Sequence, residues 1–487
     1  MTAFDQDFTM TIAGQGVAGA ATLAVLNPAT EETVAKAPNC TREQLDDAVA
    51  AARAAFPGWR AAPLEVRRAG VAKFAEVIGG NLADFARLFT REQGRPVDKA
   101  QQELMGAAFW CQTISQQEIP VTINEDTPER RSETRHVPVG VVGGIVPWNF
   151  PMLLGVWKIA CALLTGNTVV IKPSPFTPLT MLKLGELMRE HLPPGVFNVV
   201  SGGDQLGPWM TAHSGIDKIS FTGSTATGRR VMESAAANLK RVTLELGGND
   251  AAIVLPDVDV KAVAEQLFWG AFGNSGQICI AIKRLYVHAD IYDAVARELA
   301  AIAARVKVGD GLEQGSELGP IQNRAQFERV KALIDDAKAK GQVFLSGGEV
   351  PEGKGYFVPV TIVDNPPEDS RVVVEEAFGP VLPLLKFDDV EDVIARANAS
   401  DYGLGGSVWS ADADKAAEIA ARLDTGTVWV NEAQYIMPWI PFGGHKQSGI
   451  GVEGGADGLL EYTNAQTITI RKTAPPAVPR AEAGVAA

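Results

Sequence analysis

Residues 137–172, VPVGVVGGIVPWNFPMLLGVWKIACALLTGNTVVIK, decide the fold. The run Val137–Val142 is apolar and β-branched, which predicts a strand that the next two glycines end. Met152–Leu164 is apolar and long enough for a buried helix, which the Gly-Asn pair at 166–167 stops. Thr168–Lys172 predicts a second strand. A strand, a helix and a strand in this order indicate two parallel strands joined by a crossover helix.

The same alternation continues towards residue 255. Further strands are predicted at Phe197–Val200, Lys218–Phe221, Arg241–Leu246 and Ala251–Leu255, with helices at 178–189 and 227–239. This pattern predicts an α/β fold, a parallel sheet with helices on both faces. Ligands bind such sheets beyond the carboxyl ends of the strands. The glycine-rich turns SGGDQLG and FTGSTATG follow two of these strands, although neither matches the GxGxxG or GxxxxGK[ST] pattern of phosphate-binding loops.

The flanking segments predict more helices, a second α/β unit and exposed β-ribbons. Residues 41–115 have the pattern of amphipathic helices, with a break at the Pro-Gly-Trp of 57–59. The alternation resumes over 256–440, with helices predicted at Val260–Phe272, Ile291–Val306 and Gln326–Lys340. Residues 117–136 and 464–472 show the polar alternation of extended ribbons. Because an exposed strand edge is a liability unless another strand pairs with it, these ribbons indicate contact with another subunit.

Composition excludes several classes of protein. The 487 residues are 46% hydrophobic and 21% charged, which fits two or three globular domains. A net charge of −14 argues against nucleic acid as the main partner. No run approaches the ~18 apolar residues that would span a bilayer, and the N-terminus lacks the pattern of a secretion signal. Four cysteines without a CxxC pair and five scattered histidines predict neither disulfides nor a metal site, so we expect a cytoplasmic protein.

Cys279, in FGNSGQICIAIKR, is a candidate nucleophile. Gly273, Ser275 and Gly276 precede it, so the thiol is expected at an exposed turn. Backbone N–H groups there would lower the thiol pKa below its ordinary value of about 8.5. Taken alone, a packing cysteine between two isoleucines is the commoner interpretation.

Glu245 and Asn149 are candidates for acid–base and oxyanion chemistry. Glu245 ends an apolar strand before a Gly-Gly turn, where desolvation would raise its pKa towards that of a general base. Asn149 lies between Pro147 and Pro151 in a stiff turn, where its carboxamide can donate to a developing oxyanion. A structural salt bridge for Glu245 and a turn-forming role for Asn149 stay open as alternatives.

Other residues carry little signal individually. Lys172 ends a strand and could hold a ribose or phosphate, although a solvated lysine is the more frequent case. Gly223 and Ser224 in FTGSTATG could lie near a pyrophosphate at a helix N-terminus. Glu376 and Phe442 are unremarkable by themselves.

Taken together, these segments resemble the aldehyde dehydrogenase superfamily, from about residue 25 to 472. Eight motifs occur in the order and spacing of the family: NPATEE, PWNFP, KPS, FTGST, ELGG, GQxC, EEAFGP and PFGGxKxSG. One such motif would be weak evidence, whereas eight in order are specific. The resemblance implies a Rossmann-like parallel-sheet cofactor domain, a second α/β catalytic domain and a small β-ribbon oligomerisation element.

The resemblance also implies roles for particular residues. Cys279 matches the nucleophile that forms a thioester, Glu245 the general base that hydrolyses it, and Asn149 the oxyanion-hole side chain. Positions that match the dinucleotide-binding site are Val146, Trp148, Lys172, Ser174, Gly207, Phe221, Gly223, Ser224, Leu246, Glu376 and Phe378. Positions that match the aromatic wall of the substrate tunnel are Phe150, Trp157 and Phe442.

Two departures from the family pattern concern the coenzyme and one turn. Many members that prefer NAD have a glutamate three residues after the lysine, and this position is Pro175 here. The carboxylate that would repel a 2′-phosphate is therefore missing, so we expect NAD and leave NADP open. A lysine commonly follows the Gly-Gly pair in the family, and Asn249 stands there instead. The sequence offers no explanation of that change.

The predicted domains are 1–117 with 137–246 for the dinucleotide, 247–445 for catalysis, 118–136 with 464–473 as the oligomerisation arm, and 474–487 as a disordered tail. Aromatic and aliphatic pocket segments without an arginine predict an uncharged aliphatic or aromatic aldehyde, although Lys283 lies nearby.

We expect a homodimer or homotetramer that acts on a small-molecule aldehyde, with no nucleic-acid or membrane partner. A coenzyme A-acylating or phosphate-reducing relative and a catalytically idle binding protein stay open as alternatives. Members that pass the acyl group to coenzyme A lack a glutamate at the position of Glu245, so its presence favours hydrolysis.

Overall fold

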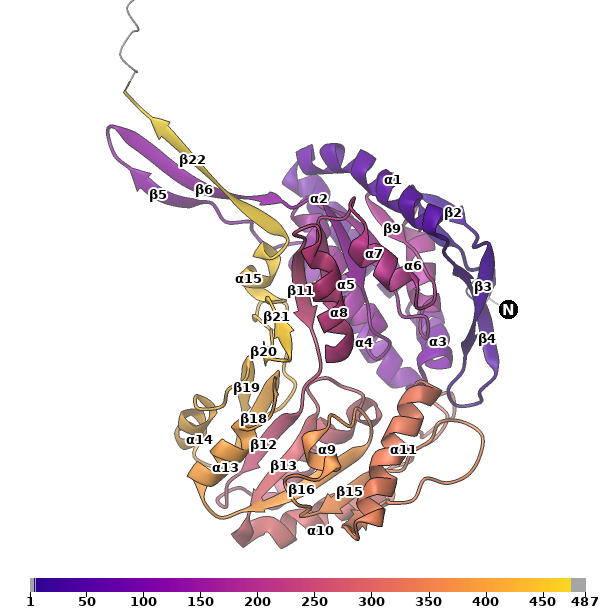
Figure 1. Cartoon of the computed structure of the whole chain (residues 1–487), viewed down its shortest axis with the longest axis vertical. Helices are drawn as coiled ribbons and strands as arrows, with labels where there is room; N and C mark the ends of the chain where they lie inside the picture. Colours follow the sequence, from indigo (N-terminus) through magenta and orange to yellow (C-terminus); the bar gives the residue numbers. More distant parts are fainter. Residues whose placement is uncertain (1–3, 5, 474–487) are drawn as a thin grey trace, which may run out of the picture.

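Two α/β sheets lie one above the other, and a three-stranded ribbon projects from the upper one (Figure 1). These features come from a computed structural model that describes residues 4 and 6–473. The upper sheet has the strand order β2-β1-β9-β8-β7-β10-β11-β21, and the lower sheet has the order β14-β15-β16-β13-β12-β18-β19.

The centre of the upper sheet consists of parallel strands, as the alternation predicts. These strands are β7 (Val141–Ile145), β8 (Thr168–Lys172), β9 (Phe197–Val199), β10 (Lys218–Thr222) and β11 (Arg241–Glu245). The helices between them are α5 (Pro151–Leu164), α6 (Leu179–Met188), α7 (Leu206–Ala212) and α8 (Thr225–Ala236). Antiparallel strands flank this centre: β1 (Met10–Ile12), β2 (Gln15–Val17) and β21 (Gly449–Ile450).

The first predicted strand is shifted because its two glycines do not end it. Gly143 and Gly144 lie inside β7, which begins at Val141. A side chain on Gly144 would collide with Ile171 of β8, and one on Gly143 would crowd Ile219 of β10. The glycines therefore mark close packing of neighbouring side chains and not a turn.

The N-terminal helices pack against this sheet. They are α1 (Arg42–Ala61), α2 (Leu64–Gly80), α3 (Leu82–Gln93) and α4 (Val97–Ile114), after the hairpin of β3 (Ala21–Leu26) and β4 (Thr33–Asn39). The predicted break at 57–59 is wrong, since α1 continues through Pro57. A proline removes only one helical N–H, and the buried Trp59 holds the last turn by donating from Nε1 to Leu163 O at 3.0 Å.

The lower sheet is parallel except for its edge strand β14. Its strands are β12 (Asp250–Val254), β13 (Ile282–His288), β14 (Val343–Ser346), β15 (Thr361–Asp364), β16 (Val381–Phe387), β18 (Gly405–Trp409) and β19 (Thr427–Val430). The strand predicted at 251–255 therefore begins the second sheet instead of extending the first.

Helices complete the lower half of the molecule. They are α9 (Val260–Phe272), α10 (Ala289–Arg305), α11 (Arg324–Ala339), α12 (Arg371–Val374), α13 (Val390–Asn398) and α14 (Ala413–Ala420), with β17 (Tyr402–Gly403) paired to β20 (His445–Lys446). The three helices predicted in this half are α9, α10 and α11, and the bounds of α9 are as predicted.

The ribbon is built from the two segments that the sequence marks as extended. Strands β5 (Thr122–Asp126), β6 (Arg130–Pro138) and β22 (Thr463–Arg471) form one antiparallel sheet, which leaves the body after α15 (Gly455–Leu460) (Figure 1). Hydroxyl pairs join β6 to β22, with Ser132 Oγ 3.1 Å from Thr469 Oγ1. The predicted tail, 474–487, lies outside the described residues. Within the described ranges, no helix combines the length and the apolar character that a bilayer span requires.

Asn167 ends α5 and ties it to two other parts of the chain. After Gly166, in the left-handed conformation with φ 90°, the Asn167 amide donates to Thr165 Oγ1 at 2.8 Å and to Tyr462 O at 2.9 Å. Its Oδ1 accepts from Gly140 N at 2.9 Å. The helix stop that the Gly-Asn pair predicts is thus a fully buried hydrogen-bonded junction.

We predict that Asn167→Ala lowers the free energy of unfolding by about 2–4 kcal/mol, because it leaves buried donors and acceptors unpaired. Urea unfolding followed by tryptophan fluorescence measures the change. Asn238→Ala is the control, since the exposed Asn238 makes one weak bond of 3.3 Å to Ala212 O. Equal stability of the two variants would contradict the role of Asn167.

Candidate active site

A cavity of about 140 Å³ lies where strands of the upper sheet end and face the lower half of the molecule. Eight of the residues expected in the site line it: Trp148, Asn149, Gly223, Ser224, Leu246, Cys279, Glu376 and Phe378. Five lining residues were not predicted: Pro147, Thr222, Gly247, Gln326 and Arg329. Folding therefore gathers five separate motifs around one space.

The loop before Cys279 is strained and firmly anchored. Asn274 and Ser275 have φ of 50° and 55°, a conformation that non-glycine residues seldom adopt. Ser275 Oγ donates to Gly319 O at 2.7 Å, which holds the strained backbone. Gly276 has φ of 71°, and a side chain there would collide with the backbone of Gly379. Cys279 is half-buried and lines the cavity, whereas the other three cysteines are buried.

The expected lowering of the thiol pKa is wrong for this environment. Burial raises the pKa of Cys279 to about 12, and the nearby carboxylates of Glu245, Asp250 and Glu376 act in the same direction. The ammonium of Lys283 opposes them. Desolvation and three acids therefore outweigh the local N–H groups on which the expectation was based.

Glu245 occupies the environment that the sequence predicts. It is the last residue of β11, it is buried, and neither carboxylate oxygen has a hydrogen-bond partner among the described residues. Burial raises the pKa of Glu245 well above its ordinary value, and the charge of Glu453 adds to the rise. Such a carboxyl group holds a proton strongly, as a general base requires.

A buried ion pair accompanies Glu245. Lys158 Nζ lies 2.8 Å from Glu453 Oε1, and both side chains are only 1% exposed. Ser220 Oγ also donates to Glu453 Oε1, at 3.0 Å. The Lys158 ammonium opposes the rise in the pKa of Glu245. Sequence reasoning missed this pair, which joins residues 295 positions apart.

Asn149 joins the turn after β7 to the nucleophile loop. Its Nδ2 donates to Gln277 O at 3.0 Å. Its backbone oxygen accepts a hydrogen bond from Arg95 and another from Asn274 Nδ2 at 3.3 Å. The carboxamide is thus held beside Cys279 with a second N–H of Nδ2 left for another acceptor.

Arg95 and Glu103 hold the backbone around Asn149 in place, and the sequence did not predict this pair. Arg95 Nη1 lies 2.5 Å from Glu103 Oε2, and both side chains are buried. Glu103 Oε1 accepts from the backbone N–H groups of Met152 and Leu153 at the start of α5, each at 3.0 Å. A signal was present, because Glu103 falls on the otherwise apolar buried stripe of α4.

The side of the cavity that the resemblance assigns to the coenzyme has a helix N-terminus and two aromatic rings. Ser224 caps α8 by accepting from Thr227 N at 3.3 Å. Trp148 and Phe378 meet edge to face with ring centroids 5.3 Å apart. Phe378 has φ of 47°, and Gln326 Nε2 donates to its carbonyl oxygen at 3.0 Å.

Five predicted coenzyme residues do not line this cavity: Val146, Lys172, Ser174, Gly207 and Phe221. Val146 follows β7, Lys172 ends β8 and Ser174 lies in the turn after it, whereas Phe221 lies inside β10 and Gly207 in the first turn of α7. Val146 N donates to Lys172 O at 3.0 Å, and the Lys172 side chain is buried, which lowers its pKa to about 8. Lys172 is therefore not the solvated lysine that the alternative interpretation assumed.

Glu376 connects the two halves at the cavity. Its Oε1 accepts from Gly248 N at 3.1 Å, and Lys283 Nζ lies 3.8 Å from the same atom. Arg329 Nη2 donates to the backbone oxygen of Glu376 at 3.1 Å. Burial raises the pKa of the Glu376 carboxyl group.

A second, mainly apolar cavity of about 410 Å³ begins behind Phe150 and Ile278, the neighbours of Asn149 and Cys279. Of the three predicted substrate residues, only Phe150 lines it. Trp157 and Phe442 are buried and stack with ring centroids 6.0 Å apart. These two predicted substrate residues therefore lie outside the lining of both cavities.

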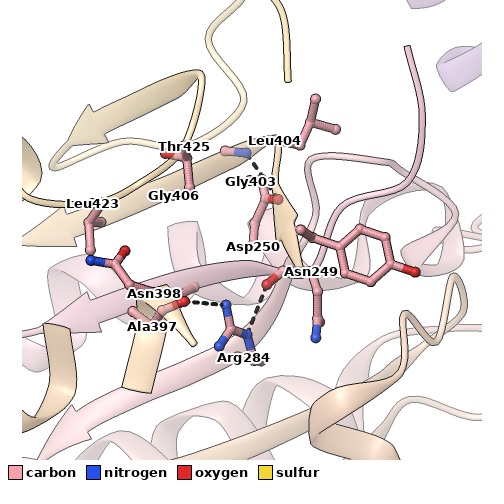
Figure 2. A pocket seen from close by; sticks show the side chains of 13 residues that line it. Asn249, Asp250, Arg284, Ala397, Asn398, Gly403, Leu404, Gly406, Leu423 and Thr425 are labelled. Atoms are coloured by element: carbon pink, nitrogen blue, oxygen red, sulfur yellow. Dashed lines mark hydrogen bonds between the residues drawn. The ribbon is translucent and has the colours of Figure 1, made fainter. Parts of the chain in front are cut away.

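Asn249, for which the sequence offered no explanation, fastens the start of β12. Its Nδ2 donates to Val373 O at 2.8 Å. Its backbone oxygen accepts from Arg284 Nε at 2.9 Å (Figure 2). Arg284 also donates to Ala397 O at 2.9 Å, and Asp250 Oδ1 accepts from Gly405 N at 3.2 Å. Asn249 is therefore a structural residue behind the site.

Comparisons with known proteins agree with this geometry. Residues 17–468 match the model of the aldehyde dehydrogenase family. A probable aldehyde dehydrogenase from Pseudomonas sp is 43% identical, over 96% of this chain and 95% of its own length. A phenylacetaldehyde dehydrogenase from Pseudomonas fluorescens is 40% identical, over 95% of each chain. The structure of a Bacillus cereus aldehyde dehydrogenase in complex with NAD⁺ superimposes with a TM-score of 0.94 at 37% identity, covering 96% of this chain and 98% of that one.

The chain belongs to the aldehyde dehydrogenase family. It is an NAD(P)-dependent oxidoreductase that acts on aldehydes, and its fold is that of solved aldehyde dehydrogenases.

We predict that Arg95→Met lowers the free energy of unfolding by about 3–5 kcal/mol, because it leaves the buried Glu103 carboxylate without its cation. Chemical unfolding of the single and double variants measures this cost. Arg95→Met combined with Glu103→Gln is expected to recover part of it. A double variant that is less stable by the sum of the single effects would show that the two residues act independently.

Proposed function

We propose that the chain oxidises an uncharged aliphatic or aromatic aldehyde to the carboxylic acid through a thioester on Cys279. The observation that carries this proposal is the shared cavity of Cys279, Asn149 and Glu376, with the unpartnered carboxylate of Glu245 buried nearby. A nucleophile, an oxyanion donor and a base are the groups that acyl chemistry requires.

The residues on the coenzyme side fit a nicotinamide dinucleotide. The N-terminus of α8 at Ser224 can face a pyrophosphate, Lys172 and Glu376 can hold ribose hydroxyls, and Trp148 and Phe378 form an aromatic edge beside the thiol. When bound, the oxidised nicotinamide supplies a positive charge that favours the thiolate and accepts a hydride from the substrate carbon.

The protein's own groups account for the remaining chemistry. Cys279 loses its proton to water, and the sulfur forms a bond to the carbonyl carbon while the π electrons move to oxygen. Asn149 Nδ2 and the Cys279 N–H stabilise that oxyanion, which typically contributes ~3–4 kcal/mol per donor. After oxidation, Glu245 takes a proton from water, whose oxygen attacks the thioester. The carbon–sulfur bond then breaks and releases the acid and the Cys279 thiolate.

The second cavity supports an uncharged substrate. Its wall is mainly apolar, with Leu153, Trp269 and Leu318 beside Phe150 and Ile278. Its charged lining residues are Arg95 and Glu103, which pair with each other, together with Lys99 and Glu317. Lys283 donates to backbone carbonyls and so is not directed at a substrate carboxylate. The phenylacetaldehyde dehydrogenase among the relatives acts on an aldehyde of this kind. These observations favour aliphatic or aromatic aldehydes over semialdehyde acids.

Assembly and compartment follow from the ribbon and the thiols. The exposed β5–β6–β22 ribbon fits a contact with another copy of the chain, as a homodimer or homotetramer. All four cysteines are free, which fits a reducing compartment such as the cytoplasm. The division into domains at 117, 137 and 246 is likewise part of the proposal.

We predict that Glu245→Gln releases about one equivalent of reduced nicotinamide per site and then turns over at least ~10²-fold more slowly, because the thioester forms and is not hydrolysed. Stopped-flow absorbance of the reduced coenzyme with an aldehyde panel measures burst and steady state. Because the pKa of Glu245 is raised, wild-type turnover should fall as pH drops through that pKa.

Cys279→Ala is the control and should show no burst. Full steady-state activity in Glu245→Gln would contradict the assignment of Glu245 as the general base. A burst that coenzyme A resolves faster than water would overturn hydrolysis in favour of acyl transfer.

Pro175 is predicted to govern the choice between NAD and NADP. Pro175→Glu places a carboxylate after Lys172, which would repel a 2′-phosphate and lower kcat/KM for NADP relative to NAD by at least about tenfold. Pro175→Ala should leave the ratio within about twofold of wild type, since it adds no charge. Initial rates with both coenzymes give the ratio, and equal effects of the two substitutions would contradict the electrostatic explanation.

A further inference from the structure

Lys283 places a buried ammonium group beside the nucleophile. It lies four residues after Cys279, at the start of β13, and its side chain is only 5% exposed. Its Nζ donates to Cys279 O at 2.6 Å and to Ile278 O at 2.8 Å, and lies 3.8 Å from Glu376 Oε1. The three N–H groups of the ammonium thus face three oxygens of the site.

We propose that Lys283 is a positioning residue that fixes the peptide groups on both sides of Cys279 and holds a positive charge beside its thiol. This inference rests on the proposed function, because it takes Cys279 as the nucleophile.

The geometry of the peptide group explains how Lys283 fixes the backbone on both sides of Cys279. In a trans peptide the C=O and the N–H point in opposite directions. The Ile278 carbonyl accepts from Lys283 Nζ at 2.8 Å and from Ala281 N at 3.1 Å. The Cys279 N–H of the same peptide therefore points away from the ammonium. None of the hydrogen bonds among the described residues uses that N–H. A cation on the carbonyl oxygen also polarises the peptide, which strengthens its N–H as a donor.

The charges around the thiol explain why the positive charge of Lys283 matters for its reactivity. Three carboxyl groups raise the pKa of the Cys279 thiol by their charge: Glu245 at the end of β11, Asp250 of β12, and Glu376, which lines the cavity with the thiol. Lys283 is the cation that opposes them among the described groups. The same ammonium favours the ionised forms of Asp250 and Glu376. Loss of this charge would remove the cation that offsets these acids at the thiol, while Arg329, which also lines the cavity, stays in place.

Lys240 offers a matched control elsewhere in the chain. It is buried, and its Nζ donates to two backbone carbonyls, His213 O at 2.6 Å and Ile216 O at 2.9 Å. It precedes β11 and lies outside both cavities. Lys240→Met therefore removes a similar structural contact without touching the thiol.

The test measures alkylation of the free enzyme by iodoacetamide and iodoacetate between about pH 6 and 9, with mass spectrometry to locate the label. In Lys283→Met, labelling of Cys279 should be at least about tenfold slower at each pH, which corresponds to a rise of one pKa unit or more. Iodoacetate should slow more than iodoacetamide, because the positive charge also attracts the anionic reagent. Lys283→Arg should stay within about threefold of wild type, and Lys240→Met should be unchanged.

Labelling of Lys283→Met at the wild-type rate or faster would overturn the inference, since a merely structural lysine would expose the thiol when removed. If that variant does not fold, Asp250→Asn tests the electrostatic role instead, because the loss of a negative charge should make the labelling of Cys279 faster and not slower. It removes one acid facing the thiol and keeps Oδ1 as the acceptor for Gly405, so Cys279 should be labelled at least about threefold faster. An unchanged rate would overturn the electrostatic role. If Cys279→Ser leaves labelling of the chain intact, the nucleophile and hence the proposed function fail instead.

Discussion

The hydrogen bond from Asn149 Nδ2 to Gln277 O is the contact on which the site depends. It joins the turn after β7 of the upper sheet to the strained loop that carries Cys279. Arg95 and Asn274 hold the backbone oxygen of Asn149 at the same junction. The carboxamide and the thiol come from different halves of the molecule, and this contact fixes their relative position. A hydrogen bond across the junction therefore fixes the carboxamide of Asn149 relative to the loop that carries the thiol.

The site concentrates acids in a region from which water is largely removed. Glu245, Asp250 and Glu376 all have raised pKa values for which burial is the first cause, and each also raises the pKa of the thiol. This arrangement is costly for a resting nucleophile and favourable for a base. It makes the reactivity of Cys279 depend on positive charge placed beside it.

Much of the fold follows from hydrophobic alternation, since β8, β10 and α9 lie where the pattern places them. The errors at Gly143–Gly144 and Pro57 have one cause: local propensity was overridden by packing against distant residues. The motifs located the lining of the cavity. Arg95 with Glu103 and Lys158 with Glu453 were missed, because a buried ion pair is a property of two segments and neither segment alone shows it. The thiol pKa was missed for the same reason.

The ribbon has a consequence for the biogenesis of the protein. Strand β6 pairs with β22, and Ser132 meets Thr469 across 337 residues of sequence. On the ribosome, β6 can pair with β5 at once, whereas its second partner, β22, is made more than 300 residues later. A polypeptide that terminates before residue 463 lacks β22, so one edge of β6 stays without the strand that covers it.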